Sequence, residues 1–216
     1  MMNALLLVAL LAGGDWAGVP TFASLPTPAV AAMAQEGLGF TDYVKLAEGK
    51  ITTQRRKTPA DKSGVHVAAF GIMRTSQETL WDAIADCERQ PEFMPHFEAC
   101  STVTPDHPLP PNERWNMNRL SFGVFPLKVK IEVIQHAVLD KPNRLTWGKV
   151  KGDTKVSEGY WRIISLDKTH QLLAYDTLSD PGAAVPDVVQ RMLTERDLPN
   201  TVEAMRKRVE DGLGKR

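Results

Sequence analysis

The sequence predicts an α+β fold in which a curved antiparallel β-sheet wraps around a long C-terminal helix. Three observations support this prediction. Two short helical segments interrupt the early strands at residues 75–97, about six strand-like segments follow from 97 to 178 with only turns between them, and helical periodicity returns over 186–211. Strands joined by short turns pair antiparallel, because parallel neighbours need long crossovers. A twisted sheet of this size curls, so its concave face can bury the last helix.

The first predicted strands form a hairpin. Residues 49–55 have the composition of a short strand, and residues 65–73 form a longer apolar one. Between them, residues 58–64 read Thr-Pro-Ala-Asp-Lys-Ser-Gly, a composition typical of a turn. The short connection predicts that these two strands lie side by side.

Two short helices are predicted next. Thr75 and Glu78 have the spacing of a capping box, in which each side chain satisfies a free backbone N–H at the helix start. The apolar stripe that follows consists of Leu80, Trp81, Ile84 and Cys87. Pro91 lacks an N–H donor and clashes with the preceding turn, so the helix must end before it. We expect a second helical turn at residues 93–97 to close one end of the groove.

Six strands and one helix complete the predicted fold. The strands are expected at 97–105, 113–122, 127–133, 144–151, 157–166 and 171–178. The clearest alternation is in 127–133, where Leu, Val and Ile alternate with Lys and Glu, as in a strand with one buried face. The final helix, 186–211, carries an apolar stripe and is interrupted by Pro199.

The first 34 residues differ in composition from the rest, with Asp15 as their one charged side chain. The nine apolar residues 4–12 have the length of a signal-peptide core and are too short to span a bilayer. Small-residue cleavage sites follow at Thr21-Phe22-Ala23 and at Ala32-Met33-Ala34. We therefore expect an export signal at 1–34, a lead-in segment at 35–47, a ligand-binding domain at 48–211 and a tail at 212–216. A periplasmic or secreted protein is the corresponding prediction.

The charge and the two cysteines limit the remaining function classes. Of 216 residues, 26 are basic and 26 are acidic, so nothing in the net charge indicates a nucleic-acid partner. Cys87 continues the helical stripe and is interpreted first as a small buried core residue. The alternative is a Cys87–Cys100 disulfide, which an exported protein permits. The spacing of the two cysteines does not fit a zinc site.

Several stretches resemble the START-like (SRPBCC, helix-grip) superfamily, and more closely its polyketide cyclase/dehydrase and coenzyme Q-binding branch. They are Thr75–Trp81, Asp86–Pro95, Gly159–Arg162 and Asp197–Val202. The resemblance covers about 48–211 and implies a hydrophobic tunnel between the sheet and the C-terminal helix that takes up lipids, sterols, quinones or polyketides. Cys87 departs from it, since a larger apolar residue is common at that position.

Neither a catalytic motif nor a metal-ligand pattern is found, so no catalytic residue, metal or cofactor is predicted. Aromatic residues spread over several strands instead indicate the wall of a cavity, with the packing of an ordinary core as the alternative. If Trp115 faces inward, Met117 and Arg119 do too, and a buried guanidinium needs a partner such as Glu158 or an anionic head group. The predicted ligand-binding residues are Trp115, Met117, Arg119, Val129, Ile131, Trp147, Trp161, Tyr175, Val189, Met192 and Met205. The loops 122–126 and 182–186 are predicted to form the mouth.

Three functions follow in order of preference. The first is binding or transfer of a hydrophobic small molecule, with transient membrane contact and no obligate protein partner. The second is a cyclase or dehydratase that acts on a hydrophobic substrate in the same cavity, which would require a buried polar dyad. The third is a structural or interaction protein whose groove is filled by its own side chains.

Overall fold

The computed structural model describes residues 16–124, 127–182 and 197–211. Its helical elements are η1 (Phe22–Ser24), α1 (Thr27–Gln35), α2 (Phe40–Ala47), α3 (Gln77–Ala85), η2 (Cys87–Glu92) and α5 (Leu198–Asp211). Its strands are β1 (Thr52–Arg55), β2 (Val65–Arg74), β3 (Phe97–Val103), β4 (Glu113–Val124), β5 (Leu127–Asp140), β6 (Arg144–Gly152), β7 (Val156–Ser165) and β8 (His170–Asp180).

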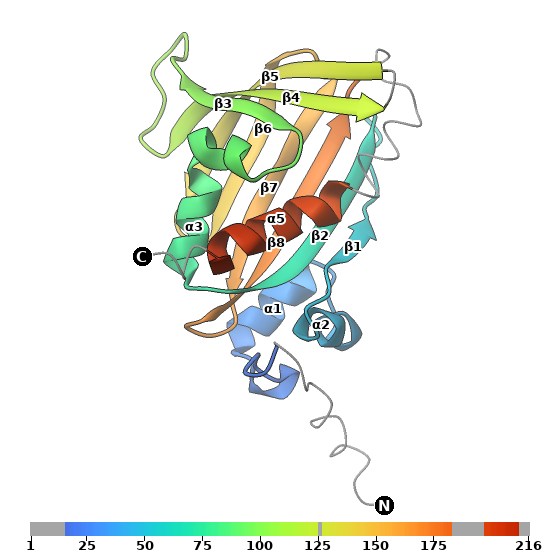
Figure 1. Cartoon of the computed structure of the whole chain (residues 1–216), viewed down its shortest axis with the longest axis vertical. Helices are drawn as coiled ribbons and strands as arrows, with labels where there is room; N and C mark the ends of the chain where they lie inside the picture. Colours follow the sequence, from blue (N-terminus) through green and yellow to red (C-terminus); the bar gives the residue numbers. More distant parts are fainter. Residues whose placement is uncertain (1–15, 125–126, 183–196, 212–216) are drawn as a thin grey trace, which may run out of the picture.

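All described strands belong to one sheet in the order β1-β2-β8-β7-β6-β5-β4-β3, with every neighbouring pair antiparallel. β3 to β8 follow one another in the sheet as in the sequence, and β2 then pairs with β8 from the other side. The sheet curves around α5, which crosses its concave face (Figure 1). The α+β, helix-grip arrangement predicted from the sequence is confirmed.

The helix α5 is packed closely against the concave face. Val202 and Met205 are fully buried in the core that they share with β2, α3 and the middle of the sheet. Gly71 of β2 permits this approach, because a Cβ at its position would lie 2.6 Å from Ile51 Cδ1 and 2.9 Å from Val202 Cγ1. Arg206 fixes the helix further by donating to the carbonyl of Ile72 at 3.1 Å.

The convex face carries a second core that the sequence analysis did not predict. Alternate residues of β2 point to this face, and α1 and α2 cover them. The most deeply buried side chains from the two helices are Ala29, Met33, Tyr43 and Leu46, each at most 3% exposed. The predicted domain start at residue 48 therefore leaves out helices that share a core with β2, β7 and β8.

A buried carboxylate fastens α1 to the sheet. Glu36, 2% exposed, accepts from Arg162 Nη1 at 2.8 Å and from the Tyr160 hydroxyl at 2.7 Å. Arg56 Nη2 lies 3.6 Å from the same carboxylate and donates to the Glu36 carbonyl at 2.8 Å. Burial and the bond to Glu36 raise the pKa of Tyr160. These contacts stabilise the position of α1, because removing the carboxylate would leave Arg162 without its charged partner, whereas Arg56 would keep the nearby Asp176.

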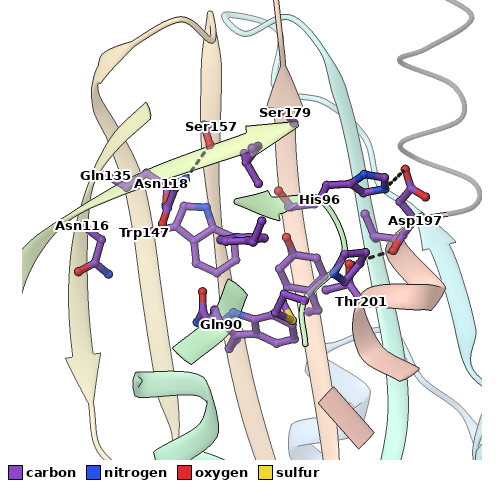
Figure 2. A pocket seen from close by; sticks show the side chains of 18 of the residues that line it. Gln90, His96, Asn116, Asn118, Gln135, Trp147, Ser157, Ser179, Asp197 and Thr201 are labelled. Carbon is purple, nitrogen blue, oxygen red and sulfur yellow. Dashed lines mark hydrogen bonds and ion pairs between the residues drawn. The ribbon is translucent and has the colours of Figure 1, made fainter. Parts of the chain in front are cut away.

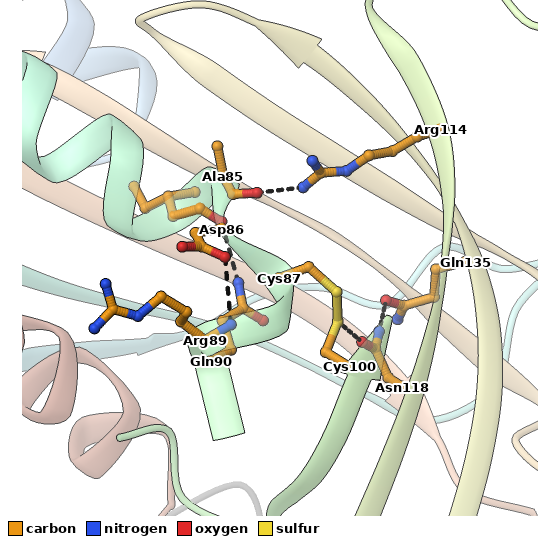
Figure 3. Close-up of a disulfide and its surroundings, with 10 residues drawn as sticks. Ala85, Asp86, Cys87, Arg89, Gln90, Cys100, Arg114, Asn118 and Gln135 are labelled. Atoms are coloured by element: carbon orange, nitrogen blue, oxygen red, sulfur yellow. Dashed lines mark hydrogen bonds between the residues drawn. A yellow bond between two sulfur atoms is a disulfide. The ribbon is translucent and has the colours of Figure 1, made fainter. Parts of the chain in front are cut away.

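The region between β2 and β3 differs from prediction in three details. The second helical turn is η2 at Cys87–Glu92, with Pro91 inside it, and the prediction of a helical turn at 93–97 is wrong. The N-cap of α3 is Ser76, whose hydroxyl accepts from the backbone N–H of Thr79 at 3.1 Å, whereas Thr75 was expected. Cys87 is joined to Cys100 by a disulfide with a Cα–Cα distance of 5.5 Å (Figure 3), so the favoured interpretation of Cys87 as a free core residue is wrong. The disulfide ties η2 to β3 and holds the proline-containing segment 91–95 at the end of the groove.

Within the described residues, no helix combines the length and the apolar character that crossing a membrane requires.

Candidate functional site

A cavity of about 200 Å³ lies between the concave face of the sheet, the η2–β3 segment and the start of α5 (Figure 2). Much of its lining is apolar and includes Val65, Val67, Ile84, Ala137, Leu145 and Leu198. Ligand pockets usually measure roughly 300–1,000 Å³, so this one encloses a small ligand or part of a larger one.

Three aromatic rings form one wall of the cavity. Trp161 of β7 stands opposite Tyr175 of β8, and their rings stack with centroids 4.0 Å apart. Trp147 of β6 stacks on the same tyrosine at 5.7 Å. Gly159, the cross-strand partner of Trp147, leaves room for its indole, because a Cβ there would lie 2.7 Å from Trp147 Cζ2. Burial raises the pKa of Tyr175 to about 12, so its hydroxyl stays neutral.

A polar band crosses the cavity wall above these rings. Asn118 of β4 donates to Gln135 Oε1 at 2.5 Å, and Gln135 donates to Ser157 Oγ at 2.8 Å. The carboxamide oxygen of Asn118 also lies 2.7 Å from Cys100 Sγ, which places the band against the disulfide. Each member has a partner, as buried polar groups usually do. The band is therefore a preformed part of the wall.

Two further polar side chains of β4, Asn116 and Arg114, line the same cavity. Arg114 Nη2 donates to the carbonyl of Ala85 at the end of α3 (Figure 3). Burial lowers the pKa of this guanidinium, although Asp86 and Glu88 oppose the shift. The cavity thus has a cationic donor at the side that faces α3.

The His96–Asp197 pair lies where the η2–β3 segment approaches α5. His96 Nε2 lies 3.1 Å from Asp197 Oδ2, and Nδ1 lies 3.2 Å from the carbonyl of Ser121 (Figure 2). His96 has a φ of 66°, a conformation that few residues other than glycine adopt. Since its ring nitrogens lie near acceptors on two different segments, this histidine links the two sides of the cavity.

Of the predicted site residues, Trp147, Trp161 and Tyr175 line the cavity together. Trp115, Met117 and Arg119 do not, and the prediction that their face of the strand points inward is wrong. The residues that alternate with them line the cavity: Asn116, Asn118, Leu120 and Phe122.

The contacts of Trp115 and Arg119 agree with a position on the other face. Trp115 packs edge-on against the His107 ring at 5.6 Å. Arg119 pairs with Glu132 at 3.0 Å in an exposed position. Glu158, the suggested buried partner, instead accepts from Lys62 at 2.6 Å. Arg119 therefore needs no buried partner.

The remaining predicted residues lie elsewhere. Val129 and Ile131 pack with Leu120 and Phe122 in a small cluster on the same wall, next to the cavity lining. Met205 belongs to α5 and is buried in the core between this helix and the sheet. Val189, Met192 and the mouth positions 125–126 and 183–186 lie outside the described residues.

Four polar residues that line the cavity are not among the predicted ligand-binding residues: Arg114, Asn116, Asn118 and Gln135. Polar residues in a strand are normally assigned to the wet face. A pair of asparagines on the same face as Leu120 was the available signal, because polar side chains inside an apolar cavity orient a ligand.

Three solved structures illustrate the similarity of the whole fold. Human StAR-related lipid transfer protein 5 is 10% identical, with a TM-score of 0.63 over 85% of this chain and 96% of that one. A STAR-related lipid transfer protein from Xanthomonas axonopodis is 14% identical, with a TM-score of 0.60 over 74% and 93%. The ZhuI aromatase/cyclase from Streptomyces sp. R1128 is 16% identical, with a TM-score of 0.54 over 68% and 94%.

Comparison with curated proteins gives no match. The family model described as "Polyketide cyclase / dehydrase and lipid transport" matches residues 73–206, which run from the end of β2 into α5 and include most of the residues that line the cavity. Because this match covers more than half of the sequence, the chain belongs to the polyketide cyclase/dehydrase and lipid transport family.

Proposed function

We propose that this protein binds and carries a hydrophobic small molecule in the cavity between the sheet and α5. The observation that carries the proposal is the wall formed by Trp147, Tyr175 and Trp161, which presents stacked rings to a mainly apolar cavity. Such a wall offers a large contact area together with a few polar groups that orient the ligand. Two of the similar structures are named as lipid transfer proteins, which supports the same function.

The contacts of the His96–Asp197 pair support carriage over cyclase or dehydratase activity. Those reactions require a group that is free to accept a proton from the substrate. Among the described residues, His96 and Asp197 are the nearest candidates, and each ring nitrogen of His96 faces an acceptor of the protein, the Asp197 carboxylate or the Ser121 carbonyl. A link between α5 and the η2–β3 segment is the simpler role for this pair.

Organic extraction of the purified protein, followed by mass spectrometry, tests the proposal. We expect a lipid, sterol, quinone or polyketide to co-purify. Thr177→Trp should exclude it, because Thr177 lines the cavity. Thr146→Trp is the matched control, since Thr146 alternates with the cavity residues Leu145 and Trp147 and faces the other side. An extract without apolar compounds, together with no uptake of a lipophilic dye, would contradict the proposal.

We also infer that the protein is exported and that its signal is cleaved before Trp16. The Cys87–Cys100 disulfide supports an oxidising compartment. The apolar run ends at Ala12, and the small residues Gly13 and Gly14 directly follow it and suit cleavage there. Cleavage after Ala34 would cut through α1 and remove the buried side chain of Met33.

The intact mass of the mature protein from an exporting host tests this inference. We expect an N-terminus between residues 13 and 16. An N-terminus at residue 35 in a folded protein would contradict it, and an uncleaved chain in a reducing compartment would contradict export itself.

A further inference from the structure

One cavity side chain lacks the hydrogen bond that its burial demands. Asn116 is 8% exposed and lines the cavity, and its Oδ1 has no hydrogen-bond partner among the residues that the structure describes (Figure 2). The neighbouring band formed by Asn118, Gln135 and Ser157 is internally paired, so it does not serve Asn116. A buried amide oxygen without a donor is unfavourable, and nearly all such groups in folded proteins have one.

A second unpaired group lies two residues away on the same face of β4. Arg114 uses Nη2 to bond the Ala85 carbonyl, but its buried Nε has no partner in the described part of the chain. The cavity wall therefore presents an acceptor, Asn116 Oδ1, and a donor, Arg114 Nε, close together in sequence. Neither atom has a hydrogen-bond partner among the described residues, and an apolar ligand would supply none.

We propose that the carried molecule has a hydroxyl group at this end, which donates to Asn116 Oδ1 and accepts from Arg114. This inference rests on the proposed function and narrows its ligand class to hydroxylated amphiphiles. A hydrocarbon end would leave both groups unpaired, and a carboxylate has no proton for Asn116. An ammonium group would be repelled by the positive charge of Arg114. A hydroxyl matches both groups because it donates and accepts at once.

The apolar body of the ligand then extends toward the rings of Trp147, Trp161 and Tyr175. Sites that hydrogen-bond a ligand hydroxyl discriminate strongly against analogues without it, because the polar groups of the site are then left unpaired. The hydroxyl therefore determines which apolar molecules the cavity accepts.

Calorimetric titration with 2-naphthol and 2-methylnaphthalene tests the inference. The two probes share a bicyclic ring that suits a small cavity and differ in a hydroxyl against a methyl group of similar size. The quantity compared is the ratio of the dissociation constant of 2-methylnaphthalene to that of 2-naphthol. The hydration of the free probes is the same for every protein variant. A difference in this ratio between two variants therefore reflects a difference in their binding sites.

We expect the ratio to fall about five- to tenfold in Asn116→Leu, as the loss of one hydrogen bond predicts. Thr146→Val is the control, because Thr146 faces the other side of the sheet, and the ratio should not change. If Asn116→Leu fails to fold, the side-chain amide resonance of Asn116 in the wild type provides the test, and it should shift more with 2-naphthol than with 2-methylnaphthalene.

An unchanged ratio in Asn116→Leu, or an equal shift with both probes, would overturn the hydroxyl inference while the apolar cavity stands. Failure of both probes to bind the wild type would overturn the proposed function, and this inference with it.

Discussion

Replacing Gly159 by alanine is predicted to destabilise the protein and to disturb the aromatic wall. The new Cβ would lie 2.1 Å from the Asp176 carbonyl oxygen and 2.7 Å from Trp147 Cζ2. Overpacking of a buried site costs about 1–3 kcal/mol. We expect the upper part of this range, about 2–3 kcal/mol, because the backbone oxygen cannot rotate away as a side chain can. For a chain of this size the melting temperature should fall by about 4–12 °C.

Urea denaturation followed by tryptophan fluorescence measures the effect on stability. The midpoint should decrease at an unchanged slope, since the surface exposed on unfolding stays the same. Gly148→Ala is the matched control, because a Cβ at this neighbouring-strand glycine meets nothing within 4 Å. Affinity for an apolar ligand should fall in Gly159→Ala and not in the control. Equal midpoints for the two variants would refute the argument that Gly159 makes room for the Trp147 indole.

Three other predictions concern the remaining supports of the fold. Glu36→Ala should lower the free energy of unfolding by about 2–3 kcal/mol, less than for a fully buried ion pair because the side chain of Arg162 is 22% exposed. A melting temperature within 1–2 °C of wild type (roughly 0.5 kcal/mol) would show that α1 does not depend on this carboxylate. The double substitution of Cys87 and Cys100 by serine, which opens a loop with a sequence separation of 13, should cost about 3 kcal/mol in urea denaturation, and unaltered stability would count against the tether. The pKa values of all three tyrosines are raised above 10, chiefly by burial and for Tyr175 to about 12. The neutral phenols therefore stabilise the fold fully below about pH 10, and this contribution is lost as the pH rises through 12. Phenolate absorbance should be absent from the native protein near pH 10 and present in urea, so native ionisation near pH 10 would be inconsistent with these shifts.

Most of the fold could be predicted from the sequence because each element has a local signal. The alternation in 127–133, the turn residues between strands and Pro91 each act within a few residues of their own position. The order of these signals along the chain then specifies an antiparallel sheet closed by a helix.

The orientation of β4 could not be predicted, because both of its faces carry large apolar side chains. Trp115 and Met117 lie on one face, and Leu120 and Phe122 lie on the other. The Trp115 ring packs against His107, which lies outside β4 in the segment before it. The alternation of residues within β4 therefore does not indicate this contact. A single wrong face assignment then moved every predicted β4 site residue out of the cavity.

The disulfide and the N-terminal helices depend on contacts between distant residues. Helical spacing correctly places Cys87 near the core but does not report that the chain turns at η2 and brings Cys100 within 5.5 Å, Cα to Cα. The apolar residues of α1 resemble the downstream part of a signal peptide because both are rich in alanine. Only the packing of Met33 against the convex face distinguishes the two.

Indole resonances measured by ¹H–¹⁵N NMR during titration with an apolar ligand test the central claim most directly. The rings of Trp147 and Trp161 line the cavity, whereas Trp115 lies on the opposite face and serves as an internal control. We predict saturable shifts of the Trp147 and Trp161 indole signals while that of Trp115 stays in place. Binding that moves the Trp115 signal and leaves the other two unchanged would contradict a carrier site between the sheet and α5.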